Sequence, residues 1–456
     1  MSNEIYKVRQ PSFINRDISV QAVVPGSKSI TNRALLLAAM ADGTCTLKGC
    51  LASDDAVHFL ECLKTLGFPV NIASDKEPGI DISITGFGGS VPNKKAEIYV
   101  GSAGTAARFL TAMLAFSDGE NTVNSSEQMK ERPMQPLINV LRSTGAVIDC
   151  PENEGHFPLH IVGVKDKAAI PDSLTVNIDE SSQFLSALLI AAGTLGKRAE
   201  IHVTGNHGLS YADMTVKMMK SFGVSAEKRI ENGQVKYLFS GEGSYKAIEY
   251  RVEPDMSAAA YFYALAAVLG ARVAVKGISD NMLQGDAEFL KVLQKMGCTV
   301  IGYSGSSDHH EETSGGILVI GAQNGKLKGG FTTDMSAFSD QALTLAAIAP
   351  FADAPITITG IGHIRVQECD RIKAIADNLT ALGIIVNVNR DEVTIYPGTP
   401  KGCVIETYDD HRVAMSFALT GLRTKGLRIA DPYCCKKTFA QYFDILERVI
   451  SELEKK

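Results

Sequence analysis

Three segments of the chain place basic side chains beside the start of an apolar run. They are PGSKSITNR (25–33), SAGTAARF (102–109) and YDDHRVAM (408–415). Each has the pattern of a helix N-terminus, where free backbone N–H groups and the helix dipole attract anions. Arginine is locally unfavourable there unless an anion or a carboxylate offsets its charge. The segments therefore predict a site for a small molecule with several negative charges.

A second interpretation needs no ligand. Serine is a preferred helix cap, so Ser181 and Ser182 would only cap a helix. Glu368 and Asp370 would form a capping carboxylate pair, and His411 would be an ordinary surface histidine. Asp255 and Asp340 would complement helix dipoles. The arginines argue against this interpretation, because capping does not call for a cation.

The chain also contains an internal repeat, in which a helical pattern is followed by glycine and a β-branched run. The glycines are spaced by 78, 78, 74 and 86 residues, and each suits the left-handed position that ends a helix. A sixth helix is expected near 439–452, where the chain ends. The five segments are 55–70, 136–147, 213–224, 286–300 and 370–386, with glycines Gly67, Gly145, Gly223, Gly297 and Gly383.

A second series of helices alternates with the first. Each member opens on polar residues, continues through Ala/Leu-rich sequence and is in most cases followed by a β-like stretch. The chain therefore reads as six copies of one unit, and so long a period favours compact units, three to a domain, over a solenoid. The second series starts near Lys28, Gly104, Ser182, Asp255, Asp340 and Asp410.

Composition excludes several classes of function. The 456 residues suggest two or three domains, and the net charge of −6 without a Lys/Arg run argues against nucleic-acid binding. The longest apolar run, 258–269, is too short to span a bilayer, and the N-terminus has no signal-peptide core. Nine cysteines without a C-x-x-C pair indicate reduced thiols in a cytoplasmic protein, and no spacing suits zinc.

Further motifs along the chain carry a resemblance to a known family. They are MKERP (129–133), SSQFLSALL (181–189), EPDMSAAAYF (253–262), SDQALT (339–344), QECDR (367–371) and KTFAQYF (437–443). With the three basic segments, they resemble, over essentially the whole chain, the 5-enolpyruvylshikimate-3-phosphate synthases among the enolpyruvyl transferases. The resemblance implies an α/β fold of two domains with three βαβαββ repeats each and with helix N-termini facing the interdomain cleft. One domain would be discontinuous (1–26 and 252–456) and the other inserted (27–251).

The resemblance also implies an activity. The enolpyruvyl group of phosphoenolpyruvate would pass to the 5-hydroxyl of shikimate 3-phosphate through a tetrahedral intermediate, with release of phosphate. This is a step of the shikimate pathway toward chorismate and the aromatic amino acids, and the family is the target of glyphosate. No metal or organic cofactor, nucleic acid or membrane is expected, and the protein is expected to be a cytoplasmic monomer.

Site residues follow from the same resemblance, each carried over from a matching motif. Asp340 would accept the hydroxyl proton, Glu368 would protonate the methylene carbon with help from Lys28, and His411 would orient groups or shuttle protons. Phosphoenolpyruvate would be bound by Lys28, Gly104, Arg132, Gln183, Arg371, Arg412 and Lys437. Shikimate 3-phosphate would be bound by Lys28, Ser29, Arg33, Ser181, Ser182, Gln183, Tyr211, Asp340 and Gln367.

Four positions depart from the family pattern. Ser102 stands where asparagine is usual, Phe109 where proline often follows the arginine, Gln367 where lysine is common and His363 where asparagine is frequent. The change at position 367 removes one cation from the expected substrate site. Ser102 and Phe109 are expected to weaken inhibition by glyphosate.

Two alternative functions remain to be compared. A UDP-N-acetylglucosamine enolpyruvyl transferase would carry a reactive cysteine five residues before the Arg132–Pro133 pair, but Glu127 stands there. A non-catalytic phosphate-binding relative would lack the reacting carboxylates, whereas Asp340 and Glu368 are both present.

Overall fold

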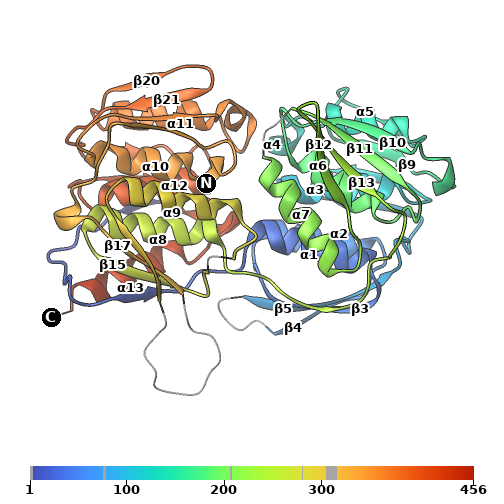
Figure 1. Ribbon diagram of the computed structural model, residues 1–456, viewed down its shortest axis with the longest axis horizontal. Helices are drawn as coiled ribbons and strands as arrows, with labels where there is room; N and C mark the ends of the chain where they lie inside the picture. Colours follow the sequence, from blue (N-terminus) through green and yellow to red (C-terminus); the bar gives the residue numbers. More distant parts are fainter. Residues whose placement is uncertain (1–3, 75–78, 206–207, 280, 304–315, 456) are drawn as a thin grey trace. The chain divides into compact units, whose positions relative to one another are not determined.

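The computed structural model describes residues 4–74, 79–205, 208–279, 281–303 and 316–455 (Figure 1). The chain divides into two compact units. We call Gly26–Val252 the inserted unit, and Met1–Pro25 together with Glu253–Lys456 the split unit.

The inserted unit contains three four-stranded sheets. In spatial order, these are β14 (Glu249–Arg251), β3 (Asp42–Cys50), β5 (Ile80–Phe87), β4 (Val70–Ser74); β6 (Lys95–Tyr99), β7 (Glu120–Asn124), β9 (Leu159–Val162), β8 (Val147–Asp149); and β10 (Ser173–Asn177), β11 (Ala199–Thr204), β13 (Gln234–Phe239), β12 (Glu227–Glu231). Its α-helices are α1 (Lys28–Met40), α2 (Asp54–Thr65), α3 (Gly104–Ala115), α4 (Glu127–Lys130), α5 (Gln135–Ser143), α6 (Gln183–Ala192) and α7 (Leu209–Ser221).

The split unit also contains three sheets. They are β16 (Thr299–Tyr303), β17 (Gly316–Ile320), β15 (Arg272–Lys276), β2 (Val20–Ala22); β18 (Phe331–Asp334), β19 (Ile356–Thr359), β21 (Glu392–Ile395), β20 (Val386–Val388); and β1 (Ile5–Lys7), β23 (Arg428–Ala430), β22 (Val404–Ile405). Its α-helices are α8 (Met256–Leu269), α9 (Phe289–Lys295), α10 (Ala342–Ile348), α11 (Arg371–Ala381), α12 (His411–Gly421) and α13 (Tyr442–Leu453).

Every four-stranded sheet has the same order and direction of strands. Two strands form a parallel pair, and two antiparallel strands that form a hairpin extend the sheet from one of them. Where the two parallel strands follow each other in sequence, an α-helix connects them. In the sheet of β18 to β21, for example, Ile356 lies opposite Phe331 in the parallel pair and opposite Ile395 in the antiparallel pair. The prediction of an α/β fold built from βαβαββ repeats is confirmed.

Three strands, β1, β2 and β14, pair with strands that are far from them in sequence. β2 precedes α1 in the chain but pairs with β15 of the split unit, and β14 precedes α8 but pairs with β3 of the inserted unit. The last repeat has no hairpin of its own, and β1 from the N-terminus pairs with β23 in its place. In both units, a strand from one end of the chain segment therefore completes a sheet that is formed mainly by distant residues.

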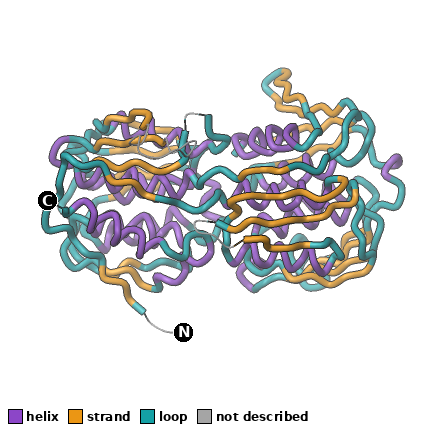
Figure 2. The backbone as a smooth tube through the Cα atoms, turned by 90° about the horizontal axis from the view of Figure 1, so that it is seen from below, coloured by secondary structure: helices purple, strands orange, loops and turns teal. Residues whose placement is uncertain are grey.

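The two series of helices have different environments. The Ala/Leu-rich helices form the cores, and every residue of α3 and of α8 is buried. The helices of the other series bury one face, as α2 and α11 do, with charged residues on the opposite face. Figure 2 shows the helices of each unit side by side, with strands along the outside.

The glycines that the repeat predicts to end helices have the expected backbone. Their φ angles are 90°, 96°, 97°, 91° and 77° for Gly67, Gly145, Gly223, Gly297 and Gly383. Only glycine adopts this left-handed region without steric cost, so the prediction is confirmed. One helix start differs from expectation: α10 begins at Ala342, because Asp340 lies in a preceding 3₁₀ turn, η4 (Ser339–Gln341).

No helix of the described part of the chain has both the length and the apolar character needed to cross a membrane.

A glycine next to β17 tests how closely sheet and core helix pack. A Cβ added at Gly321 would lie 1.9 Å from the carbonyl oxygen of Ala266 in α8, so Gly321→Ala must displace backbone. We expect a loss of about 2–3 kcal/mol in the free energy of unfolding, measured by urea denaturation. Gly302→Ala in neighbouring β16 is the control, because no described atom lies within 4 Å of its added Cβ. Equal losses in both variants would contradict this account.

Candidate active site

The core helices of the inserted unit begin without side-chain caps. Ser27, Ala103 and Ser182 occupy the cap positions of α1, α3 and α6, and none of them makes a side-chain cap hydrogen bond to a described residue. The first turns of these helices also lack acidic residues. At α6 the amide of Gln183 instead donates to the Ser181 hydroxyl. The starts of α1 and α3 therefore keep backbone N–H groups that are able to bind an anion.

Two core helices of the split unit and the amphipathic helix α11 have acidic caps. Asp255 accepts a hydrogen bond from the Ser257 amide of α8 (2.9 Å), and Asp410 accepts one from the Arg412 amide of α12 (2.8 Å). Asp370 caps α11 in the same way. The capping interpretation therefore holds for Asp255 and Asp370, and the split unit supplies its own negative charge at these helix starts.

Lys28 at the start of α1 is paired with an acid. Its Nζ lies 2.6 Å from Oδ2 of Asp55, which belongs to the first turn of α2 and is 5% exposed. Asp55 was not among the predicted site residues, since an acid in the first turn of a helix is common in any protein. The pair holds the ammonium group close to the uncapped start of α1.

Arg33 is buried and donates hydrogen bonds to neutral oxygens. Nε contacts the Thr215 hydroxyl (2.7 Å), Nη1 the Ser29 carbonyl (2.9 Å) and Nη2 the Tyr211 carbonyl (3.2 Å). Burial lowers the pKa of Arg33 to about 10. The guanidinium therefore connects α1 to α7 and fixes the backbone of two predicted substrate-binding residues, Ser29 and Tyr211.

Phe109, which stands where the family often has proline, lies against this arginine. The Arg33 guanidinium carbon is 5.5 Å from the centre of the Phe109 ring, and both side chains are buried. Such a cation–π contact stabilises a desolvated guanidinium. Phe109 thus supports α1 rather than only filling space beneath α3.

Gly104 allows two arginines to approach the start of α3. A Cβ added there would lie 2.6 Å from Nη1 of Arg132 and 2.8 Å from Nη1 of Arg108. Nε of Arg132 is buried and has no hydrogen-bond partner among the described residues. A buried donor without a partner beside an uncapped helix start favours a bound anion.

Ser181, Ser182 and Gln183 lie together at the start of α6. The Ser181 hydroxyl accepts a hydrogen bond from the Gln183 amide (3.2 Å), and Oε1 of Gln183 is buried without a partner among the described residues. Gly208, at the start of α7, approaches Ser182 so closely that an added Cβ would lie 2.7 Å from its hydroxyl. The Ser181 hydroxyl therefore satisfies the first amide of α6, and the segment presents hydroxyl and amide groups at this helix start.

In the split unit, the Arg371 guanidinium binds three carboxylates. It donates to Asp340 (2.9 Å), Glu368 (2.8 Å) and Asp410 (2.8 Å), and its side chain is 1% exposed. Burial opposes its charge, but the three acids together raise the pKa of Arg371 above its ordinary value. Gln367 also accepts a hydrogen bond from Arg371, so the residue that replaces a lysine contributes an acceptor here.

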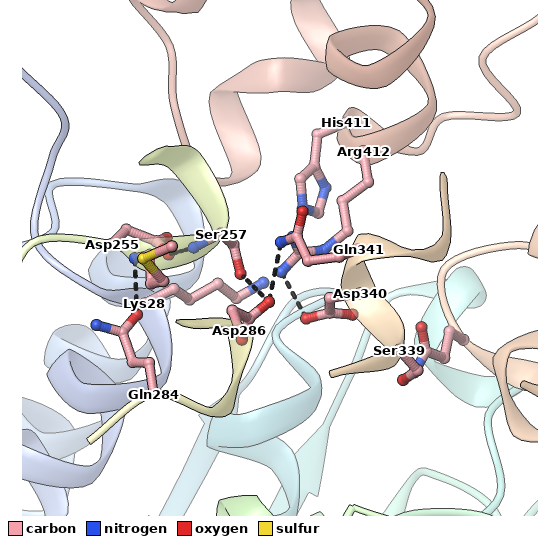
Figure 3. Close-up of polar contacts among 12 residues, drawn as sticks. Lys28, Asp255, Ser257, Gln284, Asp286, Ser339, Asp340, Gln341, His411 and Arg412 are labelled. Atoms are coloured by element: carbon pink, nitrogen blue, oxygen red, sulfur yellow. Dashed lines mark hydrogen bonds and ion pairs between the residues drawn. The ribbon is translucent and has the colours of Figure 1, made fainter. Parts of the chain in front are cut away.

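Asp340 lies between two arginines. Its second oxygen lies 2.7 Å from Nη2 of Arg412. Figure 3 shows Arg412 directed at Asp340. Burial alone would raise the pKa of Asp340, but Arg412 and Arg371 hold it below its usual value. The carboxylate is therefore ionised at neutral pH and held in a fixed orientation.

The segment just before α12 has a strained backbone. His411 follows this segment as the first residue of α12, and Lys437 lies beside it. Tyr408 and Asp409 both have φ of 53°, in the left-handed region. His411 is buried with Nδ1 3.9 Å from Asp410, and Lys437 at the end of η7 (Pro432–Lys437) has Nζ 3.5 Å from Asp409. Backbone strain is stored at functional sites when surrounding contacts hold it.

Two buried acids near Arg412 were not among the predicted site residues. Asp286 is 3% and Asp255 is 7% exposed, and burial raises the pKa of Asp255 to about 6. Asp255, Asp286 and Arg412 lie on different segments that come together only in the fold. The sequence alone therefore does not reveal this charged group. Among the described residues, no three His, Cys, Asp or Glu side chains are arranged to hold a metal ion.

The predicted site residues thus form two groups, one in each unit. The inserted unit contributes uncapped helix starts with Lys28, Arg33, Arg132 and hydroxyl groups, which suit phosphates. The split unit contributes carboxylates and arginines at fixed distances, which suit proton transfer. The two repeat-built α/β units match the fold that the resemblance to the enolpyruvyl transferases implies.

Comparison with known proteins gives the family. The profile of the EPSP synthase family (3-phosphoshikimate 1-carboxyvinyltransferase) matches residues 14–446, so the chain belongs to this family. It is 40% identical over 432 residues to a 3-phosphoshikimate 1-carboxyvinyltransferase of Nostoc punctiforme, covering 94% of this chain and 96% of the relative. It is 41% identical over 442 residues to "3-phosphoshikimate 1-carboxyvinyltransferase 2" of Halalkalibacterium halodurans, covering 96% and 93%.

The fold is also similar to that of a solved structure. The EPSP synthase of Acinetobacter baumannii superposes with a TM-score of 0.76 at 24% identity, covering 98% of this chain and 97% of that one.

Arg371 and Lys373, on the same helix, allow a matched test of the buried cation. Arg371→Lys keeps a charge but cannot bind three carboxylates at once, so buried acids lose their hydrogen bonds. We expect a loss of roughly 3 kcal/mol in the free energy of unfolding, measured by urea denaturation at pH 7. Lys373→Gln, which breaks an exposed pair with Asp377, should leave stability almost unchanged. If the two variants unfold alike, Arg371 does not organise the acids.

Proposed function

We propose that the chain transfers the enolpyruvyl group of phosphoenolpyruvate to the 5-hydroxyl of shikimate 3-phosphate and releases inorganic phosphate. The names of the relatives and the family match over residues 14–446 support this activity. The observation that carries the proposal in this chain is the pair of carboxylates, Asp340 and Glu368, held by one buried guanidinium. The reaction supplies a precursor of chorismate and the aromatic amino acids.

The inserted unit binds shikimate 3-phosphate in this proposal. Ser29 lies at the uncapped start of α1, and Ser181 and Ser182 lie at the start of α6, where a phosphate would be bound by backbone N–H groups and hydroxyls. Arg33 holds the Ser29 and Tyr211 backbones in place. Gln183 and Gln367 would contact the same substrate.

Phosphoenolpyruvate is bound by the cations. Arg132, whose Nε is buried without a partner among the described residues, and Lys28 serve from the inserted unit, next to Gly104. Arg371, Arg412 and Lys437 serve from the split unit. Planar guanidinium groups suit the bidentate binding of carboxylate and phosphate.

The remaining residues are assigned to the proton transfers of the reaction. Asp340, which the arginines keep ionised, accepts the proton of the 5-hydroxyl as its oxygen attacks C2 of phosphoenolpyruvate. Glu368, with Lys28, delivers a proton to C3, giving a tetrahedral intermediate with a methyl group. Loss of phosphate from C2 and of a proton from the methyl group then restores the double bond. His411 orients these groups.

We further propose that the protein is a monomer. We also propose that it acts in the cytoplasm, because its cysteines include no C-x-x-C pair. All nine cysteines are free, and most are buried.

An assay of phosphate release tests the activity. Release should require phosphoenolpyruvate and shikimate 3-phosphate together, and UDP-N-acetylglucosamine should not replace the second substrate. Release with the nucleotide sugar would favour the alternative transferase, and binding without release would favour a non-catalytic relative.

Glu368→Gln tests the proposed proton donor. The amide is nearly isosteric and can still contact Arg371, but it cannot donate an acidic proton. We expect kcat to fall on the order of 10²–10⁴-fold while the Kd of each substrate, measured by calorimetry, changes little. Asp370→Asn on the same segment is the control, because asparagine also caps a helix. Near-normal turnover of the Gln variant would move the role to Lys28.

Gly104→Ala tests the phosphoenolpyruvate subsite. The new methyl group must displace the guanidinium of Arg132, so the KM for phosphoenolpyruvate should rise on the order of tenfold, about 1.4 kcal/mol. Competitive inhibition by glyphosate, an anion expected to occupy the same subsite, should weaken at least as much. Gly302→Ala serves again as control. If neither ligand is affected, Gly104 does not line this subsite.

A further inference from the structure

Asp286 joins three elements of the split unit through one carboxylate oxygen. It lies in a 3₁₀ turn, η2 (Gly285–Glu288), and its Oδ1 accepts hydrogen bonds from the Ser257 hydroxyl and from Nε2 of Gln341, both at 2.9 Å. Ser257 belongs to α8, and Gln341 ends the turn η4. Figure 3 shows both donors directed at Asp286.

Gln341 is the chain neighbour of Asp340, and it is held at both ends of its amide. Nε2 donates to Asp286, Oε1 accepts from the Thr344 hydroxyl (3.0 Å), and the residue is 0% exposed. Its backbone amide also bonds to the Phe338 carbonyl (3.0 Å). The turn that carries Asp340 is therefore anchored to Asp286 through the Gln341 side chain.

These hydrogen bonds alone do not explain a charged residue at position 286. An asparagine oxygen would accept the same two bonds, and burying a carboxylate is costly. The charged groups that interact with Asp286 in the described part of the split unit are Asp255 at the start of α8, Asp340 on η4 and Arg412 on α12. Lys291 on α9 pairs with Glu288. Burial raises the pKa of Asp286, and the charge of Asp340 raises it further, while Arg412 opposes both.

A base between two arginines has a chemical difficulty. Arg371 and Arg412 orient Asp340, but their charges also weaken its attraction for a proton. A nearby carboxylate acts in the opposite direction, because like charges favour the protonated form. Glu368 raises the pKa of Asp340 in this way, and Asp286, which interacts with Asp340 and is linked to the same turn through Gln341, is a second such carboxylate.

We propose that Asp286 is a positioning residue for the transfer reaction: it anchors the turn that carries Asp340, and its charge strengthens Asp340 as a proton acceptor. The inference rests on the proposed function, since it takes Asp340 as the base. Asp286 itself need not touch a substrate, and both of its roles act through Asp340.

Asp286→Asn separates charge from anchoring. The amide keeps an oxygen for Ser257 and Gln341 but removes the negative charge, so Asp340 loses a like-charged neighbour and its pKa falls. Asp340 must be ionised to accept a proton, and the acidic limb of the kcat–pH profile should therefore move to lower pH. We expect kcat on the plateau to fall about tenfold, because a weaker base accepts the proton less readily, with KM values for both substrates within about twofold.

Gln341→Met isolates anchoring. It removes the amide link at similar volume while Asp286 keeps its charge, so kcat should fall without a shift of the acidic limb. Glu288→Gln, in the same 3₁₀ turn but exposed and paired with Lys291, is the control and should match the parent. Near-UV circular dichroism confirms that each variant is folded.

The outcomes distinguish the hypotheses. An unshifted profile and unchanged kcat in Asp286→Asn would overturn the role of the charge, and unchanged kcat in Gln341→Met would overturn the anchoring. A rise in KM without loss of kcat would instead place Asp286 in substrate binding and would also overturn the proposal. If the parent protein releases no phosphate, the proposed function fails first, which the same assay reports separately.

Discussion

The first turn of an α-helix leaves backbone N–H groups that must find acceptors, and most of this structure follows from how they are satisfied. In the inserted unit, α1 and α3 begin without a side-chain cap, so their first amides are able to receive an acceptor from outside the chain. In the split unit, Asp255 and Asp410 supply the acceptor from the chain. One repeated fold thereby provides a surface for phosphates in one unit and a set of acids in the other.

The split unit contains a group of interacting charged residues in which acids outnumber arginines. If all were ionised, the region would carry an unfavourable excess of negative charge at low dielectric. Burial raises the pKa values of Asp255 and Asp286, whereas the arginines lower that of Asp340, so the acids of this group differ in their affinity for a proton. A reaction that adds a proton to carbon and later removes one requires such a group. Its members are Asp255, Asp286, Asp340, Glu368, Asp410, Arg371 and Arg412.

Local pattern was sufficient for the fold but not for the ion pairs. The glycines that end helices, such as Gly67 and Gly383, follow from composition and spacing, because backbone conformation is a local property. Which acid meets which cation depends on segments far apart in sequence. Asp410 contacts Arg371 from 39 residues away, and Ser257 reaches Asp286 from a different helix, so neither pairing has a signature in the linear sequence.

The departures from the family pattern illustrate the same limit. Phe109 was expected to weaken inhibition by glyphosate, and in the structure its ring lies against Arg33 of another repeat. Gln367 was expected to bind shikimate 3-phosphate with one cation fewer than the family pattern, and in the structure it accepts a hydrogen bond from Arg371, four residues further along the chain. The partner of Phe109 became visible only when the repeats were packed together, whereas the partner of Gln367 lies in the same local segment.

The route of the chain also determines the order in which the protein can be completed during synthesis. β1 leaves the ribosome first, but its partner β23 is among the last strands made, and β2 must wait for β15 until the whole inserted unit has been translated. The inserted unit has all its strands once β14 is made and can close its sheets early. Until β15 and β23 are made, the strands β2 and β1 lack these partners, and unpaired strand edges are prone to pair with other chains. A permuted gene that begins at Gly26 and joins the old termini would bring every strand of the split unit into one continuous stretch of translation.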